Sequence, residues 1–225
     1  MSVWAVLVAA GRGERLGADL PKAFVRLGEL PLLAEPLRRL DESDWVDGIV
    51  VAAPPGWEEP AILVAEELGA GKVGGVVAGG DTRAESVRRA VAEVPEDAVV
   101  IVVHDAARPL VTDEVLERVL APLSEGWDGV VPGLPVTDTV KRVRDGAVAE
   151  TPPREELVAV QTPQAFAAER FRAILSGLSD SLLEAATDCS SLVEARGGRV
   201  KVVPGDPRLL KITDSADLAL VESWL

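Results

Sequence analysis

The first loop that could do chemistry combines glycines with cations. It reads Ala9-Ala10-Gly11-Arg12-Gly13-Glu14-Arg15-Leu16-Gly17, directly after an apolar run, and Pro21-Lys22 follows it. Backbone N–H groups in a glycine-rich turn can surround phosphates, because no Cβ blocks their approach. Arg15 and Lys22 can neutralise the charge of a triphosphate. The glycines alone fit a simple tight turn equally well, but the two cations favour a phosphate site.

The spacing of these glycines argues against a dinucleotide site. The dinucleotide fingerprint places its third glycine one residue earlier than Gly17 stands here. It also needs an acidic residue roughly 20 positions further on, and Glu35 falls within a predicted helix. An NAD-dependent oxidoreductase is therefore disfavoured.

A second candidate loop reads Gly79-Gly80-Asp81-Thr82-Arg83-Ala84-Glu85-Ser86 and precedes a predicted helix. The first turn of a helix offers free N–H groups and the positive end of its dipole. The glycines allow a flat base to approach the backbone, and Asp81 and Ser86 can hydrogen-bond such a base. For Asp81 alone, capping of the helix is the more ordinary role.

The third loop, His104-Asp105-Ala106-Ala107-Arg108-Pro109, follows the most hydrophobic run, Val99–Val103. An Asp at a strand end can hold Mg²⁺ or ribose hydroxyls, and Arg108 can orient it or a neighbouring loop. The alternative is a buried salt bridge beside a hydrogen-bonded His104. For His104 itself we favour that alternative.

Further polar residues come late in the chain. They are Arg154, Thr162-Pro163-Gln164, Thr187-Asp188 and Lys211-Ile212-Thr213. Isolated surface cations are usually solvated, so the residues alone give Arg154 and Lys211 only modest support as phosphate ligands.

Alternating strand and helix patterns predict the frame that positions these loops. Continuous Val/Ile/Ala-rich runs indicate strands buried on both faces and paired in parallel. They lie at Val3–Ala9, Gly48–Ala53, Val73–Ala78, Ala98–Val103 and Gly129–Val131. Helical patterns lie between them at Leu33–Leu40, Glu58–Leu68, Arg83–Val94 and Asp113–Leu123. The sequence therefore predicts one α/β domain over residues 1–225, a doubly wound and mostly parallel sheet whose ligands bind beyond the strand ends.

One segment, Leu134–Thr162, departs from this alternation. Short runs at Thr139–Val143, Gly146–Val148 and Leu157–Val160 are separated by turn residues and prolines, so we expect a β excursion. The chain then returns to helices near Ala167–Leu175 and Ser190–Ala195 and a strand at Arg199–Val203. A last helix over Leu218–Leu225 is capped by Asp214 or Ser215.

Composition narrows the class of protein. The formal charge of −14 disfavours binding to nucleic acid or anionic membranes, which requires clustered Lys and Arg. The single Cys189 and single His104 leave little for a zinc-type site, so we expect any metal to be hard and oxygen-bound. No apolar run approaches the ~20 residues of a membrane span, and no secretory signal is evident. We expect a cytoplasmic protein with a small ligand.

At this point the motifs resemble a known family, the 2-C-methyl-D-erythritol 4-phosphate cytidylyltransferases of the non-mevalonate isoprenoid pathway. The resemblance runs nearly end to end. It rests on Ala9–Arg15, Pro21-Lys22, Gly79–Ser86, His104–Pro109, Asp138-Thr139-Val140-Lys141, Thr162-Pro163-Gln164, Thr187-Asp188 and Lys211-Ile212-Thr213. The His-Asp-Ala-Ala-Arg-Pro and Thr-Pro-Gln strings are the narrower signals, because many sugar nucleotidyltransferases share the first loop.

The resemblance implies CTP, Mg²⁺ and a homodimer. CTP would contact Ala9, Ala10, Gly11, Gly13, Gly80, Asp81, Ser86, Asp105 and Ala106, and Asp105 is also a candidate metal ligand, with Mg²⁺ held chiefly by the triphosphate. Arg15, Lys22, Arg154 and Lys211 would be catalytic. The polyol phosphate would contact Arg108, Thr139, Arg154, Thr162, Thr187 and Lys211. The 134–162 excursion would be an arm that carries Arg154 into the active site of the second subunit.

Two alternatives stay open beside this interpretation. A ribitol-5-phosphate cytidylyltransferase resembles the chain throughout but usually has Ser-Val in place of Ala106-Ala107. A non-catalytic nucleotide sensor would have no use for cations that act on the transition state, such as Arg15, Lys22 and Lys211. The sequence departs from the family pattern at Cys189-Ser190-Ser191, which follow Thr187-Asp188 beside the expected polyol pocket.

Overall fold

A central sheet carries the loops identified above. The computed structural model describes residues 2–11, 13 and 20–225. Its eight-stranded sheet has the order β10-β7-β11-β6-β1-β4-β5, and β12 pairs with β7 off this path. The strands are β1 (Val3–Val8), β4 (Gly48–Ala53), β5 (Val73–Ala78), β6 (Val100–Asp105), β7 (Gly129–Pro135), β10 (Val158–Val160), β11 (Gln164–Ala167) and β12 (Val200–Pro204). Parallel pairing of β6, β1, β4 and β5, and of β7 with β12, confirms the predicted mostly parallel sheet.

Strand β11 was not predicted from the sequence. It lies antiparallel between β6 and β7, with Phe166 opposite both Ile101 and Gly129. Four residues are too few to show a strand period, and the helical pattern that begins at Ala167 hides its end. The insertion of β11 has a functional consequence, because it brings Thr162 and Gln164 next to the carboxyl end of β6.

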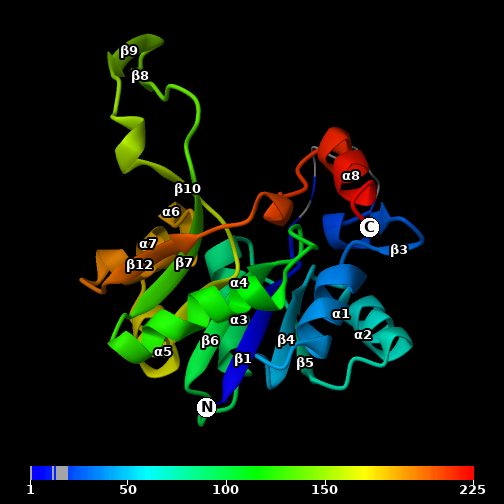
Figure 1. Cartoon of the computed structure of the whole chain (residues 1–225). Helices are drawn as coiled ribbons and strands as arrows, with labels where there is room; N and C mark the ends of the chain where they lie inside the picture. The colour runs from blue at the N-terminus through cyan, green and yellow to red at the C-terminus, as the bar shows by residue number, and fades with distance from the viewer. Residues whose placement is uncertain (1, 12, 14–19) are drawn as a thin grey trace.

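Helices cover both faces of the sheet (Figure 1). One face packs against α1 (Ala34–Glu42), α2 (Glu58–Leu68) and α4 (Asp113–Leu120), the last followed by the 3-10 turn η3 (Ala121–Glu125). The other face packs against α3 (Arg83–Ala92), α5 (Ala168–Ser176), α6 (Asp180–Ala185) and α7 (Cys189–Ala195). Side chains of β1 alternate between these two cores, Leu7 in the first and Val6 in the second. This is the doubly wound architecture that the continuous apolar runs predicted.

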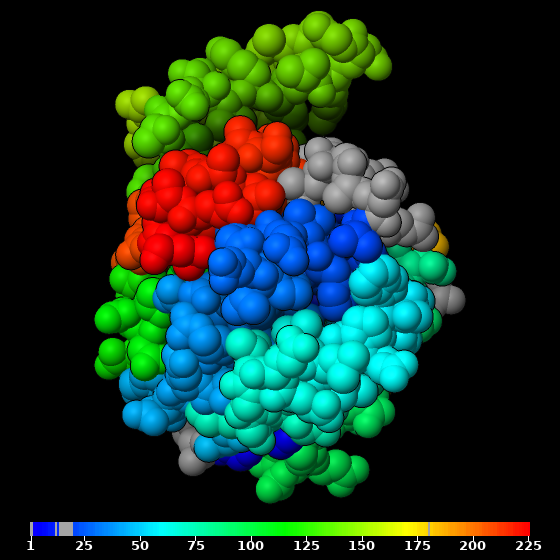
Figure 2. All heavy atoms as spheres, turned by 90° about the vertical axis from the view of Figure 1, so that its right-hand side faces the viewer, coloured from blue at the N-terminus to red at the C-terminus, as the bar shows by residue number. Residues whose placement is uncertain are grey.

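A third, smaller core joins the C-terminal segment of the chain to residues 27–32. The last helix, α8 (Ser215–Glu222), packs near the hairpin β2 (Arg26–Leu27) and β3 (Leu30–Pro31), with Leu27, Leu110, Ile212 and Val221 buried together. Figure 2 shows the red C-terminal segment lying against the blue segment that follows the first loop. Asp214 is the N-cap of α8 and forms a capping box with Asp217, so Asp214 rather than Ser215 has the predicted capping role.

An arm projects from the body of the molecule between β7 and β10 (Figures 1 and 2). Its tip is a hairpin of β8 (Arg142–Arg144) and β9 (Ala147–Glu150), with the 3-10 turn η4 (Arg154–Glu156) on the returning strand. Asp145 and Gly146 both have positive φ, which is the two-residue hairpin turn that an Asp-Gly pair favours. The predicted excursion is thus a hairpin arm.

None of the helices that the structure describes is long and apolar enough to cross a bilayer.

Candidate active site

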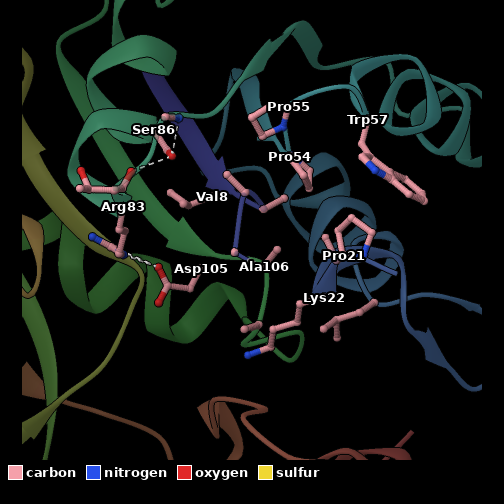
Figure 3. A pocket seen from close by; sticks show the side chains of 18 of the residues that line it. Val8, Pro21, Lys22, Pro54, Pro55, Trp57, Arg83, Ser86, Asp105 and Ala106 are labelled. Carbon is pink, nitrogen blue, oxygen red and sulfur yellow. Dashed lines mark hydrogen bonds and ion pairs between the residues drawn. The ribbon is translucent and has the colours of Figure 1, made fainter. Parts of the chain in front are cut away.

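The first cavity opens at the carboxyl ends of the parallel strands, where ligand sites of doubly wound sheets lie. It has a volume of about 730 Å³. Figure 3 shows Arg83 and Asp105 on one side of it and Pro54, Pro55 and Trp57 on the other. Its lining includes nearly all described residues expected to bind a nucleotide: Ala9, Ala10, Gly11, Gly80, Asp81, Ser86, Asp105 and Ala106, together with Lys22 and Lys211. The structure therefore brings the three predicted loops together.

Lys22 lines this first cavity and comes from the 3-10 turn η2 (Lys22–Phe24). Gly13 has a φ of +69°, and a Cβ placed on it would lie 2.5 Å from the Cβ of Lys22. A glycine is therefore required at position 13 for the backbone to pass so close to Lys22. Gly13 supports the cavity in this way without lining it, and the predicted catalytic Arg15 lies outside the described residues.

The second loop is shaped by hydrogen bonds of its own. Thr82, not Asp81, is the N-cap of α3, because its side chain accepts a hydrogen bond from the Glu85 amide. Of the two roles open to Asp81, capping of the helix is therefore excluded, and Asp81 lines the first cavity. Ser86 is buried, and its hydroxyl accepts a hydrogen bond from the Gly80 amide and donates one to the Thr82 carbonyl. Ser86 thus holds the loop in shape where a base would approach Gly80.

Asp105 lies at the end of β6 between two cations. Its Oδ1 is 2.8 Å from Arg83 Nε and its Oδ2 is 2.7 Å from Lys211 Nζ. Burial acts to raise the pKa of Asp105, but the charges of Arg83 and Lys211 outweigh it and hold that pKa far below its ordinary value. Asp105 is therefore an ionised carboxylate, and the predicted buried salt bridge is present.

His104 is wholly buried, and both of its ring nitrogens are hydrogen-bonded. Nε2 is 2.9 Å from the carbonyl of Arg108, so this nitrogen carries the proton, and Nδ1 accepts from the Thr162 hydroxyl at 3.1 Å. The same hydroxyl accepts from the Asp105 amide at 3.0 Å. Burial lowers the pKa of His104 to about 4, so the ring is neutral. The expectation of a hydrogen-bonded interior His104 is confirmed.

Arg108 was predicted to orient either Asp105 or a neighbouring loop, and the structure shows that it orients a neighbouring segment. Its Nη1 donates to the carbonyl of Leu209 at 2.6 Å, just before Lys211 in the chain. The backbone amide of Ile212 donates to the carbonyl of Ala107 at 2.8 Å. The third loop therefore fixes the segment that carries Lys211.

A second cavity of about 550 Å³ adjoins the first. Arg83, Asp105 and Lys211 line both. The second cavity also contains four of the residues expected to bind the polyol phosphate: Arg108, Thr162, Thr187 and Lys211. Thr162 lines the second cavity, but its hydroxyl already donates to His104 and accepts from the Asp105 amide.

Two expected substrate residues, Thr139 and Arg154, line neither cavity of their own chain. Both lie in the arm, where Thr139 is exposed and the Arg154 side chain is 56% exposed. Arg154 donates to the carbonyl of Thr137 within the arm. A single chain therefore leaves the predicted set of substrate residues incomplete.

Several cavity residues were not predicted. Arg83 belongs to the second loop, but no role was predicted for it from the sequence. Its position in the first turn of the predicted helix, directly after a strand end, could have indicated one. Asp188 caps α7 and accepts hydrogen bonds from Ser190, Ser191 and Gln164 at the second cavity. Cys189 is buried behind it and faces Arg83, whose Nη1 lies 3.2 Å from Sγ.

The described residues do not form a protein cage for Mg²⁺. Among them, no three His, Cys, Asp or Glu side chains lie together as a metal site would require. Both carboxylate oxygens of Asp105 are taken by Arg83 and Lys211. The donor set therefore does not support the expectation that Asp105 is a metal ligand.

Known proteins resemble this chain over nearly its whole length. The family model of 2-C-methyl-D-erythritol 4-phosphate cytidylyltransferase matches residues 3–225. A protein of that name from Frankia casuarinae is 46% identical over 99% of this chain and 81% of its own length, and one from Saccharopolyspora erythraea is 45% identical over the whole of both chains. The crystal structure of the Thermus thermophilus enzyme of that name superposes with a TM-score of 0.76 at 33% identity, over 97% of this chain and 96% of that one. The resemblance seen in the motifs is confirmed, and the chain belongs to the 2-C-methyl-D-erythritol 4-phosphate cytidylyltransferase family.

Proposed function

We propose that this chain transfers the cytidylyl group of CTP to 2-C-methyl-D-erythritol 4-phosphate and releases pyrophosphate. Family membership supports the reaction, and one observation in the structure carries it. The two cavities meet at Arg83, Asp105 and Lys211. A nucleotide in the first cavity and a phosphorylated acceptor in the second would therefore bring two phosphate groups together at these three side chains.

The reaction is an in-line displacement at phosphorus. An oxygen of the acceptor phosphate attacks the α-phosphorus of CTP, the bond from that phosphorus to the bridging β-phosphate oxygen breaks, and pyrophosphate leaves with the electron pair. The described residues offer no activated nucleophile for a covalent intermediate. Burial raises the pKa of the Cys189 thiol, and both nitrogens of His104 are hydrogen-bonded. The chain contributes position and positive charge, which supply most of the catalysis in phosphoryl-type transfers.

Lys22 and Lys211 are the described cations that can stabilise the developing negative charge. Lys22 lines the first cavity, and Lys211 lies at the junction of both. We place the cytosine near Gly80, Asp81 and Ser86 and the ribose near Asp105 and Ala106. Ala106 is buried and small, so it leaves the sugar room at the end of β6.

Mg²⁺ enters this proposal with the substrate. Since the described residues form no protein cage for it, the triphosphate would supply most of its ligands, as phosphate oxygens commonly do for Mg²⁺. When bound, the ion neutralises phosphate charge. No residue of the described chain is assigned to it.

We propose further that the active enzyme is a homodimer joined through the 134–162 arm. The arm exposes Val143, Val148, Val158 and Val160, of which Val148 is 61% accessible. Val143 and Val148 lie on the projecting hairpin, whereas Val158 and Val160 lie on β10 beside the second cavity. Exposed apolar side chains on a projecting hairpin are typical of an interaction surface. Arg154, which lines neither cavity of its own chain, would then enter the second cavity of the partner. We expect the dimer to act in the cytoplasm on small molecules, without nucleic acid.

The test is pyrophosphate release with CTP and Mg²⁺, comparing 2-C-methyl-D-erythritol 4-phosphate with ribitol 5-phosphate as acceptors, and UTP and ATP as nucleotide controls. We expect turnover with CTP and the methylerythritol phosphate. Preference for ribitol 5-phosphate would keep the mechanism and change the acceptor. Silence with both acceptors, in a protein that still binds CTP, would indicate a nucleotide sensor.

A further inference from the structure

Arg83 lies where the two cavities meet. It is the first residue of α3, directly after the Thr82 cap, and its side chain is 21% exposed. Figure 3 shows it reaching from α3 toward Asp105 across the wall of the first cavity. Among the residues that the structure describes, only Asp105 and Lys211 share with it the property of lining both cavities. The reaction described above brings the phosphates to Arg83 but assigns no role of its own to this side chain.

The contacts of Arg83 fix one oxygen of Asp105. Its Nε donates to Oδ1 at 2.8 Å, and Nη2 lies 2.8 Å from the same oxygen in an ion pair without hydrogen-bond geometry. Lys211 holds the other oxygen at 2.7 Å. The Asp105 side chain is only 9% exposed, so this carboxylate can rotate little once both oxygens are paired. Its orientation in turn sets where Lys211 Nζ lies.

The charges of the three residues do not cancel. Arg83 and Lys211 are cations and Asp105 is an anion, which leaves one net positive charge between the cavities. The fourth neighbour, Cys189, does not remove this charge, because burial raises the pKa of its thiol and keeps it neutral. Two phosphates that must approach for transfer repel each other, and a fixed positive charge in a partly water-excluded site offsets that repulsion.

We propose that Arg83 is a positioning residue for the transfer: it fixes Asp105, and through Asp105 the ammonium group of Lys211, between the two substrate phosphates. This inference rests on the proposed function and adds a residue to it. It also assigns different roles to the two contacts of the guanidinium. The contact with Asp105 carries the effect, and the contact with Cys189 only fills the space behind Arg83.

The experiment compares Arg83→Gln, Arg83→Lys and Cys189→Ser with the wild type as dimers, measuring kcat, both KM values and the Kd for CTP without acceptor. We expect Arg83→Gln to lower kcat/KM for the acceptor about 100-fold, since misplacing a reacting group by about 1 Å costs that much. The Kd for CTP should change much less than this, because Asp105 is placed beside the ribose alone, while the base and the triphosphate are placed at the other two loops. Arg83→Lys, which keeps the charge but not the fork, should recover part of the loss.

Cys189→Ser is the matched control, since it alters the other contact of the same guanidinium and leaves Asp105 paired. We expect its kinetic constants to match those of the wild type. Equal weakening of CTP binding and acceptor kinetics in Arg83→Gln would reveal a merely structural role and overturn the inference. So would a Cys189→Ser loss as large as that of Arg83→Gln. If the wild type shows no turnover, both the proposed function and the inference are overturned. If the wild type turns over and Arg83→Gln has the same kinetic constants, only the inference is overturned.

Discussion

Lys22 donates a hydrogen bond from Nζ to the backbone carbonyl of Ile212, a residue 190 positions further along the chain. Ile212 is completely buried in the small third core, and its amide is held by Ala107. Its chain neighbour Lys211 pairs with Asp105. One short segment near the C-terminus therefore fixes both described candidate catalytic lysines, although one of them comes from the start of the sequence.

We predict that Lys22→Ala lowers kcat about 10²–10³-fold while the Kd for CTP changes much less, as for other preorganised groups that stabilise transition-state charge. Steady-state kinetics combined with a CTP titration measure both quantities. Lys201→Ala is the control, because that lysine pairs with Glu125 away from both cavities. Equal losses in kcat and in CTP affinity would instead assign Lys22 to ground-state binding.

A pair of glycine substitutions tests the position of Lys22 separately from its charge. Gly13 and Gly28 both have positive φ, at +69° and +63°, so Ala at either site strains the backbone by about 1 kcal/mol. At Gly13 the new methyl group would collide with Lys22. At Gly28 no atom lies within 4 Å of the new methyl group. We expect Gly28→Ala to lose stability alone. Gly13→Ala should lose more stability, because of the added clash, and should also lose activity by about tenfold or more, since displacing a catalytic group costs at least that much. Equal activities in the two variants would contradict the proposed role of Gly13.

Mixing two inactive variants tests the shared site. If Arg154 of one subunit completes the second cavity of the other, Arg154→Ala and Lys22→Ala proteins, each poor alone, form heterodimers with one intact site and one doubly defective site. We expect activity to return toward about one quarter of the wild-type value at equal mixing, because half of the dimers are mixed and each has one good site of two. Subunit exchange is verified by mass spectrometry of the intact complex. Exchange without recovery of activity would refute the shared site.

The buried His104 predicts a pH dependence of stability. The pKa of His104 is about 4 in the folded chain and 6.5 when unperturbed. Between these two pH values the unfolded chain binds a proton at His104 and the folded chain does not. The contribution of His104 is fully present above pH 6.5 and is lost as the pH falls toward 4. At roughly 1.36 kcal/mol per pKa unit, the loss approaches about 3 kcal/mol.

Urea denaturation between pH 7 and pH 4, in the wild type and in His104→Gln, measures this contribution. Glutamine retains a hydrogen-bonding group and does not titrate. We expect the variant to be less stable at pH 7, since the bond to Thr162 is altered, but to lose less stability on acidification than the wild type does. Parallel curves for the two proteins would show that folding does not lower the pKa of His104, and would contradict a ring kept neutral by burial.

Local sequence determined the frame of this protein. Continuous apolar runs predicted β1, β4 and β6, because a strand buried on both faces cannot accommodate alternating polar residues. They also predicted β5, although this strand lies at the edge of the sheet and is only partly buried. Helical spacing predicted the helices between the strands. The turn of the arm and the cap of α8 also depend on a few adjacent residues. The sequence predicted turn residues within 134–162 and a cap at Asp214 or Ser215, and the structure places the turn at Asp145-Gly146 and the cap at Asp214. The motifs likewise placed Ala9, Gly80, Asp105 and Lys22 at one edge of the sheet.

Tertiary structure alone decided which charged side chains of the site pair with one another. The contact of Arg83 with Asp105 spans 22 positions, and that of Lys211 with Asp105 spans 106, and no local pattern encodes either. Strand β11 escaped prediction because its position between β6 and β7 depends on partners far from it in the chain. Both Asp81 and Thr82 are residue types that can cap a helix. Thr82 is the cap because the backbone places its side chain, and not that of Asp81, opposite the free amide of Glu85. Hydrophobic patterning is a local property and can be read from the sequence, whereas the meeting of charges at the junction of the two cavities exists only once the sheet has assembled.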